Sequence, residues 1–260
     1  MIKWTKSYIN GSLLSWGYNN KELFKDLSKP ILLFVHGIGA TAEQWLPLIK
    51  LLDNQYPIII INRPGYSQSA NIANSSVEDF SNKIAELLDQ LELKLPVIYI
   101  GHSMGGAIGL ASLLNHSNCY QALVAISSFS YFRASSYLLE AIKAGKYPLE
   151  AIRRGFSENS SKQLIKKFTL DFYNIPLKTI QQDLESCDGW DIRDNLCQIK
   201  QPCLLITSKE DKVISYRHSK KIHQAIENSA LKFVSNAGHN LIIENPSGVF
   251  RYLEAFLQKL

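Results

Sequence analysis

Cysteine is scarce in this chain of 260 residues, which has Cys119, Cys187, Cys197 and Cys203 and no C-x-x-C pair. This wide spacing argues against both a disulfide framework and a structural zinc site. Long apolar runs are missing as well. None reaches the roughly 18 residues that a membrane-spanning helix needs, which excludes an integral membrane protein.

The stretch 1–18 lacks the apolar core of a secretory signal peptide, because Lys3, Lys6, Asn10 and Gly11 interrupt it. The composition, 46% apolar and 20% charged, is too apolar for a disordered chain. The formal net charge is modest, at +5. We therefore expect a soluble, cytoplasmic globular protein, built as one large domain or as one domain with an insertion.

Six short runs rich in β-branched residues predict strands, and an N-terminal hairpin precedes them, with Tyr8–Ile9 and Leu13–Trp16 on either side of Asn10-Gly11. All the runs but the last, which alternates through Lys232, are apolar on both faces, as in parallel sheets covered by helices. The order predicts an α/β fold of three layers, with a mostly parallel central sheet and helices on both faces. The six runs are Ile31–Val35, Ile58–Ile61, Val97–Ile100, Ala122–Ile126, Cys203–Ile206 and Leu231–Val234.

Helix signals stand between these runs. Ser75 is predicted to cap a helix while Glu78 reaches back to it, forming a capping box. Near the C-terminus, Asn245 is the predicted cap of a last helix whose first turn holds Pro246. The stripe behind Ser75 that is predicted to be buried consists of Val77, Phe80, Ile84, Leu87, Leu88 and Leu91.

The interval from Ile126 to Cys203 is far longer than the dozen or so residues that a crossover between parallel strands needs. We therefore expect a helical segment over residues 129–190, inserted after the sixth strand into a core formed by residues 1–128 and 191–260. Its predicted helices lie near Ser135–Ala144, Pro148–Gly155, Ser160–Tyr173 and Pro176–Cys187.

The most informative motif is Gly101-His102-Ser103-Met104-Gly105, which follows the strand Val97–Ile100 and opens a helix-like run. A serine at the apex of such a tight turn has a strained backbone that holds its hydroxyl above the sheet edge. Side chains two positions before and after it would collide with the strand and the helix, and glycine stands at both. The motif predicts a nucleophilic serine at position 103.

A serine nucleophile needs a base, and the base needs an acid to orient it. Asp211 and His239 each follow a predicted strand by five residues, so they are expected at the same sheet edge as Ser103. The chain order Ser, Asp, His is that of α/β-hydrolase triads. Glu210 is the alternative acid, and we favour Asp211 because its shorter side chain suits a loop packed against the histidine.

Hydrolysis through a serine also needs two backbone N–H groups for the developing negative charge. One is expected from Met104, directly after the nucleophile. The other is expected from Ile38, within His36-Gly37-Ile38-Gly39 after the first parallel strand, where glycines let the backbone approach a substrate.

With these motifs in place, the chain resembles the α/β-hydrolase superfamily over essentially its whole length. The segment Asn62-Arg63-Pro64-Gly65-Tyr66-Ser67-Gln68-Ser69 and the pair Gly238-His239 followed by Glu244-Asn245-Pro246 extend the match. The family usually has Asp and Gly where this chain has Asn62 and Ser67. In the family, inserted helices such as 129–190 form a lid over the active site.

The resemblance implies a serine hydrolase that cleaves carboxylic esters of small or acyl-chain substrates without a metal or organic cofactor. The dehalogenases and epoxide hydrolases of the family have Asp at the elbow, so Ser103 argues against both. Alternatives that keep the triad are a carbon–carbon bond or thioester hydrolase and an esterase of carrier-bound acyl methyl esters in biotin synthesis. A non-catalytic small-molecule receptor is an alternative of another class.

The segment 129–190 offers two hints about the substrate. Its aromatic residues, among them Phe129, Phe132 and Trp190, are candidates for lining an acyl pocket. Its charge is basic, which suits an acidic acyl carrier protein as partner, although a solvated helical surface explains the charge as well. No nucleic-acid motif accompanies it. The basic residues are Arg133, Lys143, Lys146, Arg153, Arg154, Lys162, Lys166, Lys167 and Lys178, against Glu140, Glu150, Glu158 and Asp171.

Overall fold

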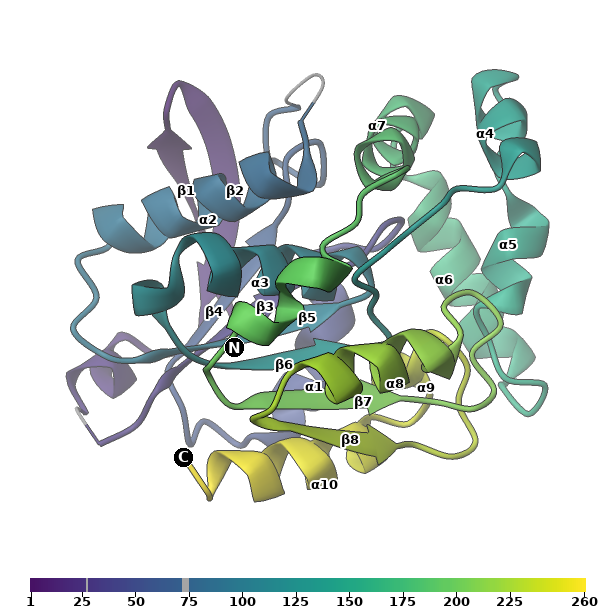
Figure 1. The fold of residues 1–260 in the computed structure, drawn as a ribbon. Helices are drawn as coiled ribbons and strands as arrows, with labels where there is room; N and C mark the ends of the chain where they lie inside the picture. Colours follow the sequence, from purple (N-terminus) through teal and green to yellow (C-terminus); the bar gives the residue numbers. More distant parts are fainter. Residues whose placement is uncertain (27, 72–74) are drawn as a thin grey trace.

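The computed structural model describes residues 1–26, 28–71 and 75–260, apart from the side chain of residue 137. An eight-stranded sheet with the order β1-β2-β4-β3-β5-β6-β7-β8 runs through the molecule (Figure 1). The strands from β4 to β8 in this order are mutually parallel, whereas β2 runs antiparallel to both β1 and β4. The strands are β1 (Lys3–Ile9), β2 (Ser12–Tyr18), β3 (Ile31–Val35), β4 (Ile58–Asn62), β5 (Val97–His102), β6 (Tyr120–Ile126), β7 (Cys203–Thr207) and β8 (Ser229–Phe233).

Each face of the sheet carries its own hydrophobic core, which confirms the expected three layers. Leu33 and Tyr99 pack on one side, whereas their neighbours Leu32 and Ile98 pack on the other, and all four are fully buried. The strands are therefore apolar without alternation because both faces are covered. The first face holds α2 (Val77–Gln90), α3 (Met104–Asn115) and α8 (Tyr216–Ala225), and the second holds α1 (Leu46–Leu51), α9 (Leu241–Glu244) and α10 (Pro246–Leu257).

Four helices form between β6 and β7, close to the predicted positions, and they stand together at one side of the sheet (Figure 1). We call residues 129–190 the insert. A third hydrophobic cluster holds Ile142, Ile152, Ile180 and Phe172 of the insert together with Tyr66 from outside it. The helices are α4 (Ser136–Lys143), α5 (Leu149–Arg154), α6 (Lys162–Tyr173) and α7 (Leu177–Cys187), and four short 3₁₀ helices cover Lys21–Lys25, Ala42–Trp45, Ser117–Cys119 and Arg193–Gln198.

No helix in the described ranges is both long enough and apolar enough to cross a membrane. The thiols of Cys119, Cys187, Cys197 and Cys203 are all unpaired.

The predicted capping box of α2 is wrong by one residue. The cap is Ser76, whose hydroxyl accepts from the N–H of Asp79 at 3.1 Å, while the Asp79 carboxylate accepts from the N–H of Ser76 at 2.8 Å. The sequence holds both Ser-x-x-acid pairs in adjacent registers. Glu78 is engaged elsewhere, because its carboxylate accepts a 2.6 Å hydrogen bond from the indole of Trp190.

Replacing Ser76 with alanine is expected to lower the free energy of unfolding by about 1 kcal/mol, because an N–H of the first turn loses its partner. Ser76→Gly is the matched control and is expected to cost only a few tenths of that amount, since glycine is also a good cap residue. Urea unfolding followed by circular dichroism measures both. Equal stability of Ser76→Ala and the wild type would contradict this assignment of the cap.

Candidate active site

Ser103 stands at a sharp turn between β5 and α3 and has a positive φ of 53° and a ψ of −121°. Its N–H donates to the carbonyl of Ile126 at 2.8 Å. A Cβ at Gly101 would lie 2.3 Å from the carbonyl oxygen of Gly105, and a Cβ at Gly105 would lie 2.2 Å from that of Val35. Both positions require glycine, so the turn is as tight as the sequence motif predicts.

The turns after β7 and β8 bring Asp211 and His239 together. The Nδ1 of His239 lies 2.9 Å from Oδ2 of Asp211, and both residues are buried. Because an ionised carboxylate only accepts hydrogen bonds, Nδ1 carries the proton and Nε2 is left as the basic nitrogen.

Asp211 is held as an anion. Its Oδ1 accepts from the N–H groups of Val213 at 2.9 Å and Ile214 at 2.8 Å. Burial opposes ionisation of this carboxyl group, but His239 and the two N–H groups outweigh it and lower the pKa of Asp211 below its ordinary value. The carboxylate therefore stays charged at neutral pH.

Glu210, the alternative acid, is engaged elsewhere. Its carboxylate accepts from the hydroxyl of Ser157 at 2.6 Å and from the N–H of Asn236 at 2.9 Å. It thus joins the insert to the loop after β8, and the partner of His239 is Asp211.

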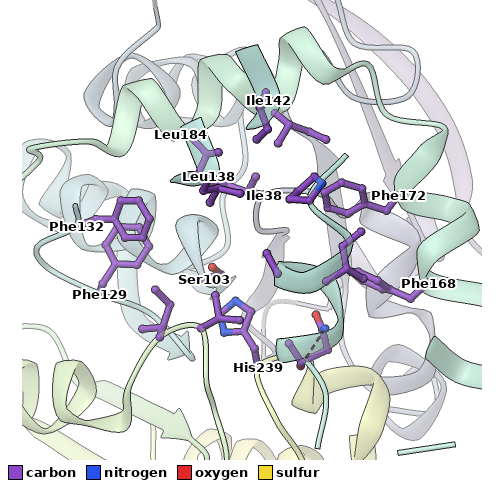
Figure 2. A pocket seen from close by; sticks show the side chains of 18 residues that line it. Ile38, Ser103, Phe129, Phe132, Leu138, Ile142, Phe168, Phe172, Leu184 and His239 are labelled. Carbon is purple, nitrogen blue, oxygen red and sulfur yellow. Dashed lines mark hydrogen bonds between the residues drawn. The ribbon is translucent and has the colours of Figure 1, made fainter. Parts of the chain in front are cut away.

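Ser103 and His239 line the same cavity (Figure 2). His102 also connects the two residues: it directly precedes Ser103, and its Nε2 donates to the carbonyl of His239 at 2.9 Å. Among the described residues, no hydrogen bond joins the Ser103 hydroxyl to the His239 ring in this conformation. Such bonds are often long in unliganded enzymes and tighten when substrate binds.

Two other buried histidines adjoin the site. Burial and the neighbouring His239 lower the pKa of His102 to about 3. Burial also lowers the pKa of His36 well below its ordinary value, and its Nε2 accepts from the N–H of Arg63 at 3.0 Å. Both rings are neutral at pH 7, so the ring of His239 is the one available as a base in the cavity. In the described part of the chain, no three His, Cys, Asp or Glu side chains gather as a metal ion would need.

The loop after β3 lies directly against Ser103. A Cβ at Gly37 would be 2.9 Å from the Cβ of Ser103. The N–H of Ile38 belongs to this loop, and that of Met104 to the first turn of α3, where helical partners are lacking. Within the described ranges neither group donates to a backbone carbonyl. Both N–H groups are free to bind a negatively charged oxygen.

A buried arginine supports this loop, and its acidic partner lies outside the sequence motifs described above. The Arg63 guanidinium donates to the carbonyls of His36 and Gly37, each at 3.1 Å, and pairs with both oxygens of Asp183 in α7, at 3.0 and 2.6 Å. Asp183 is 2% exposed. The signal that was available is its place between Ile180 and Leu184 on the buried stripe of α7, where a lone acid needs a partner.

Tyr66 completes the network around this ion pair. Its hydroxyl donates to Asp183 at 2.6 Å and accepts from the N–H of Gly39 at 3.1 Å. Burial and the Asp183 carboxylate raise the pKa of Tyr66 well above its ordinary value, so the phenol stays protonated. The hydrogen bonds of Arg63, Asp183 and Tyr66 thus hold the insert against the loop after β3.

The cavity above Ser103 has a volume of about 140 Å³ and a largely apolar wall. Phe129 and Phe132 line it on one side, and Phe168 and Phe172 line it on another (Figure 2). Trp190, the third predicted substrate-binding aromatic, does not line it. Its ring packs edge-on against Phe129 with centroids 6.1 Å apart.

A family model described as the alpha/beta hydrolase fold matches residues 30–154 and 147–246 of this chain. The chain belongs to this family. Its α/β-hydrolase fold is therefore shown by sequence as well as by the topology of the sheet.

Three of the proteins similar to it illustrate the range of this family. The uncharacterized hydrolase YugF of Bacillus subtilis (strain 168) is 24% identical over 255 residues, which are 91% of this chain and 93% of that protein. The pimeloyl-[acyl-carrier protein] methyl ester esterase of Vibrio vulnificus (strain YJ016) is 22% identical over 252 residues, which are 88% and 95%. A solved structure of a thermophilic esterase, 24% identical, covers 100% of this chain and 98% of its own with a TM-score of 0.84.

Asp183→Asn is expected to destabilise the protein by about 3–5 kcal/mol, because it leaves the buried Arg63 guanidinium without a counter-charge. Glu185→Gln on the same helix is the matched control. Its carboxylate is 3.8 Å from Lys143 at the surface, and exposed pairs contribute roughly 0–1 kcal/mol. Urea unfolding of the two variants measures the difference. Similar stabilities for both would show that the buried pair does not hold the insert in place.

Proposed function

We propose that this protein is a serine hydrolase that cleaves carboxylic esters through Ser103, His239 and Asp211. The observation that carries the proposal is the 2.9 Å pair between His239 and Asp211, in which His239 lines the same apolar cavity as a serine on a strained strand-to-helix turn. That pair leaves Nε2 of His239 as a base, and serine needs such a base to act as a nucleophile.

In this mechanism the Ser103 side chain rotates about its Cα–Cβ bond so that its hydroxyl meets Nε2 of His239. The ring takes the proton while the serine oxygen attacks the ester carbonyl. The N–H groups of Ile38 and Met104 bind the resulting oxyanion, and His239 then protonates the departing alcohol. Water hydrolyses the acyl-serine by the same relay, and Asp211 stabilises the imidazolium formed in each half.

The insert serves as the lid of this site in our proposal, and residues 1–128 and 191–260 serve as the catalytic core. Phe129 and Phe132, which line the cavity, are the proposed substrate contacts from the lid. An apolar wall close to the reacting carbonyl excludes water and strengthens the oxyanion contacts. The substrate portion bound there is therefore an uncharged, apolar group.

A narrower candidate is an ester carried by an acidic acyl carrier protein. The basic side chains of the insert support it: Lys143, Lys146, Arg153 and Arg154 all point to solvent. The relative from Vibrio vulnificus is named for such a substrate. Docking driven by these charges weakens as salt rises, whereas hydrolysis of a small neutral ester does not.

Fluorophosphonate labelling tests the proposed triad. We expect the wild type to be labelled at Ser103, Ser103→Ala to remain unlabelled, and His239→Ala to react roughly 10²–10⁴-fold more slowly, because the base is gone. His116→Ala is the matched histidine control, because His116 lies at the opposite end of α3 from Ser103 and is bonded to Asn82, and it is expected to react like the wild type. Mass spectrometry of the labelled peptide gives the site. Labelling that survives the loss of His239 at full rate would refute the relay.

A panel of p-nitrophenyl esters, thioesters and carrier-bound acyl methyl esters then sets the substrate class. Fast turnover of simple esters that Ser103→Ala abolishes supports the esterase. Preference for the carrier-bound ester, lost at high salt, supports the narrower candidate. Ligand-induced thermal shifts without turnover would instead identify a small-molecule receptor and overturn the proposal.

A further inference from the structure

A second cavity of about 410 Å³ adjoins the first and has no role in the mechanism above. It lies between α6 and the segment 39–50, which includes the end of the loop after β3 and most of α1. Ala40, Leu46, Leu164 and Ile175 give it an apolar lining. It is about three times as large as the cavity that holds Ser103.

The wall between the two cavities consists largely of side chains. Phe168 lines both cavities, and we infer that its ring stands between them. It packs against Phe156, with centroids 5.3 Å apart, and against Phe172, with centroids 6.4 Å apart. The Phe172 ring in turn covers Gly39, where a Cβ would lie 2.0 Å from it. Because an aromatic ring can be displaced or truncated without a change in the backbone, loss of the Phe168 ring would join the two cavities at little structural cost.

The size of the first cavity limits what it holds. A buried cavity of about 150 Å³ accepts benzene, so a cavity of 140 Å³ holds a group of about six carbon atoms. A longer chain on the substrate must extend beyond it. Behind Phe168, the second cavity offers space for the remainder of such a chain.

The charges at the second cavity indicate the chemistry of its occupant. Two lysines, Lys50 and Lys167, and two acids, Glu43 and Asp171, reach its lining, and all four side chains are exposed. Their charges cancel, so the site does not select an anionic headgroup. An uncharged alkyl chain suits the apolar remainder of the lining.

We propose that Phe168 limits the length of the alkyl chain that the enzyme accepts, and that the second cavity is the subsite that receives the end of a longer, unbranched chain when this ring is displaced or removed. This proposal rests on the proposed ester hydrolysis for its catalytic readout. With Phe168 in place, short chains fit the first cavity and longer ones are disfavoured. With the ring removed, the two cavities form one continuous channel.

The catalytic test is the ratio of kcat/KM for p-nitrophenyl decanoate to that for p-nitrophenyl butyrate, which cancels any general loss of activity. We expect Phe168→Ala to raise this ratio at least 10-fold over the wild type. Leu170→Ala is the matched control, because Leu170 lies on the same helix and is 55% exposed, and its ratio is expected to stay unchanged. The double variant Phe168→Ala/Leu164→Trp refills the second cavity from α6 and is expected to return the ratio to the wild-type value.

A binding measurement without turnover separates this proposal from the proposed function. Calorimetric titration with 1-octanol is expected to show at least 10-fold tighter binding to Phe168→Ala than to Leu170→Ala, and loss of that gain in the double variant. Absence of ester hydrolysis together with this binding pattern would refute the hydrolase but keep the subsite. Equal octanol affinities, or a decanoate-to-butyrate ratio that Phe168→Ala leaves unchanged, would overturn the subsite.

Discussion

The buried ion pair between Arg63 and Asp183 is the interaction on which the geometry of the candidate site depends. Removing a guanidinium and a carboxylate from water costs roughly several kcal/mol per ion, so the pair is stable only when its remaining donors and acceptors are used. Here the arginine also donates to the carbonyls of His36 and Gly37, and Tyr66 donates to the carboxylate. Because the Gly37 carbonyl shares its peptide group with the N–H of Ile38, one charge in the insert fixes the direction of the N–H that we propose as an oxyanion donor.

The strained turn at Ser103 is the second constraint, and the packing around it maintains the strain. A serine with a φ of 53° is unfavourable by itself, and it persists because the surrounding structure over-determines its conformation. Its N–H is bonded to Ile126 in β6, and the space beside Gly101 and Gly105 admits no side chain. The packing of the folded core thus keeps the Ser103 hydroxyl at the rim of the cavity.

The sequence was sufficient to predict the sheet, the four helices of the insert and the meeting of Asp211 with His239, because hydrophobic pattern and strand-end position determine them. It left Asp211 and Glu210 nearly equivalent, since adjacent acids in a loop differ only in which way the chain turns them. The cap of α2 is Ser76 and not the predicted Ser75, because neighbouring serines, like neighbouring acids, differ only in how the chain turns them. The role of Asp183 and the place of Trp190 depend on how the insert packs against the core, a long-range contact that no local pattern encodes.

The hydrogen bond between Ser157 and Glu210 gives the insert a further point of attachment, far along the chain from Asp183. Helices anchored at two separate places have a fixed orientation over the sheet, even if their outward faces change completely. An insert transplanted from a related protein would therefore keep these two anchors only if it brought a carboxylate to meet Arg63 and a hydroxyl to meet Glu210. Polar contacts of this kind, as well as the shape of the helices, therefore determine how interchangeable this part of the molecule is.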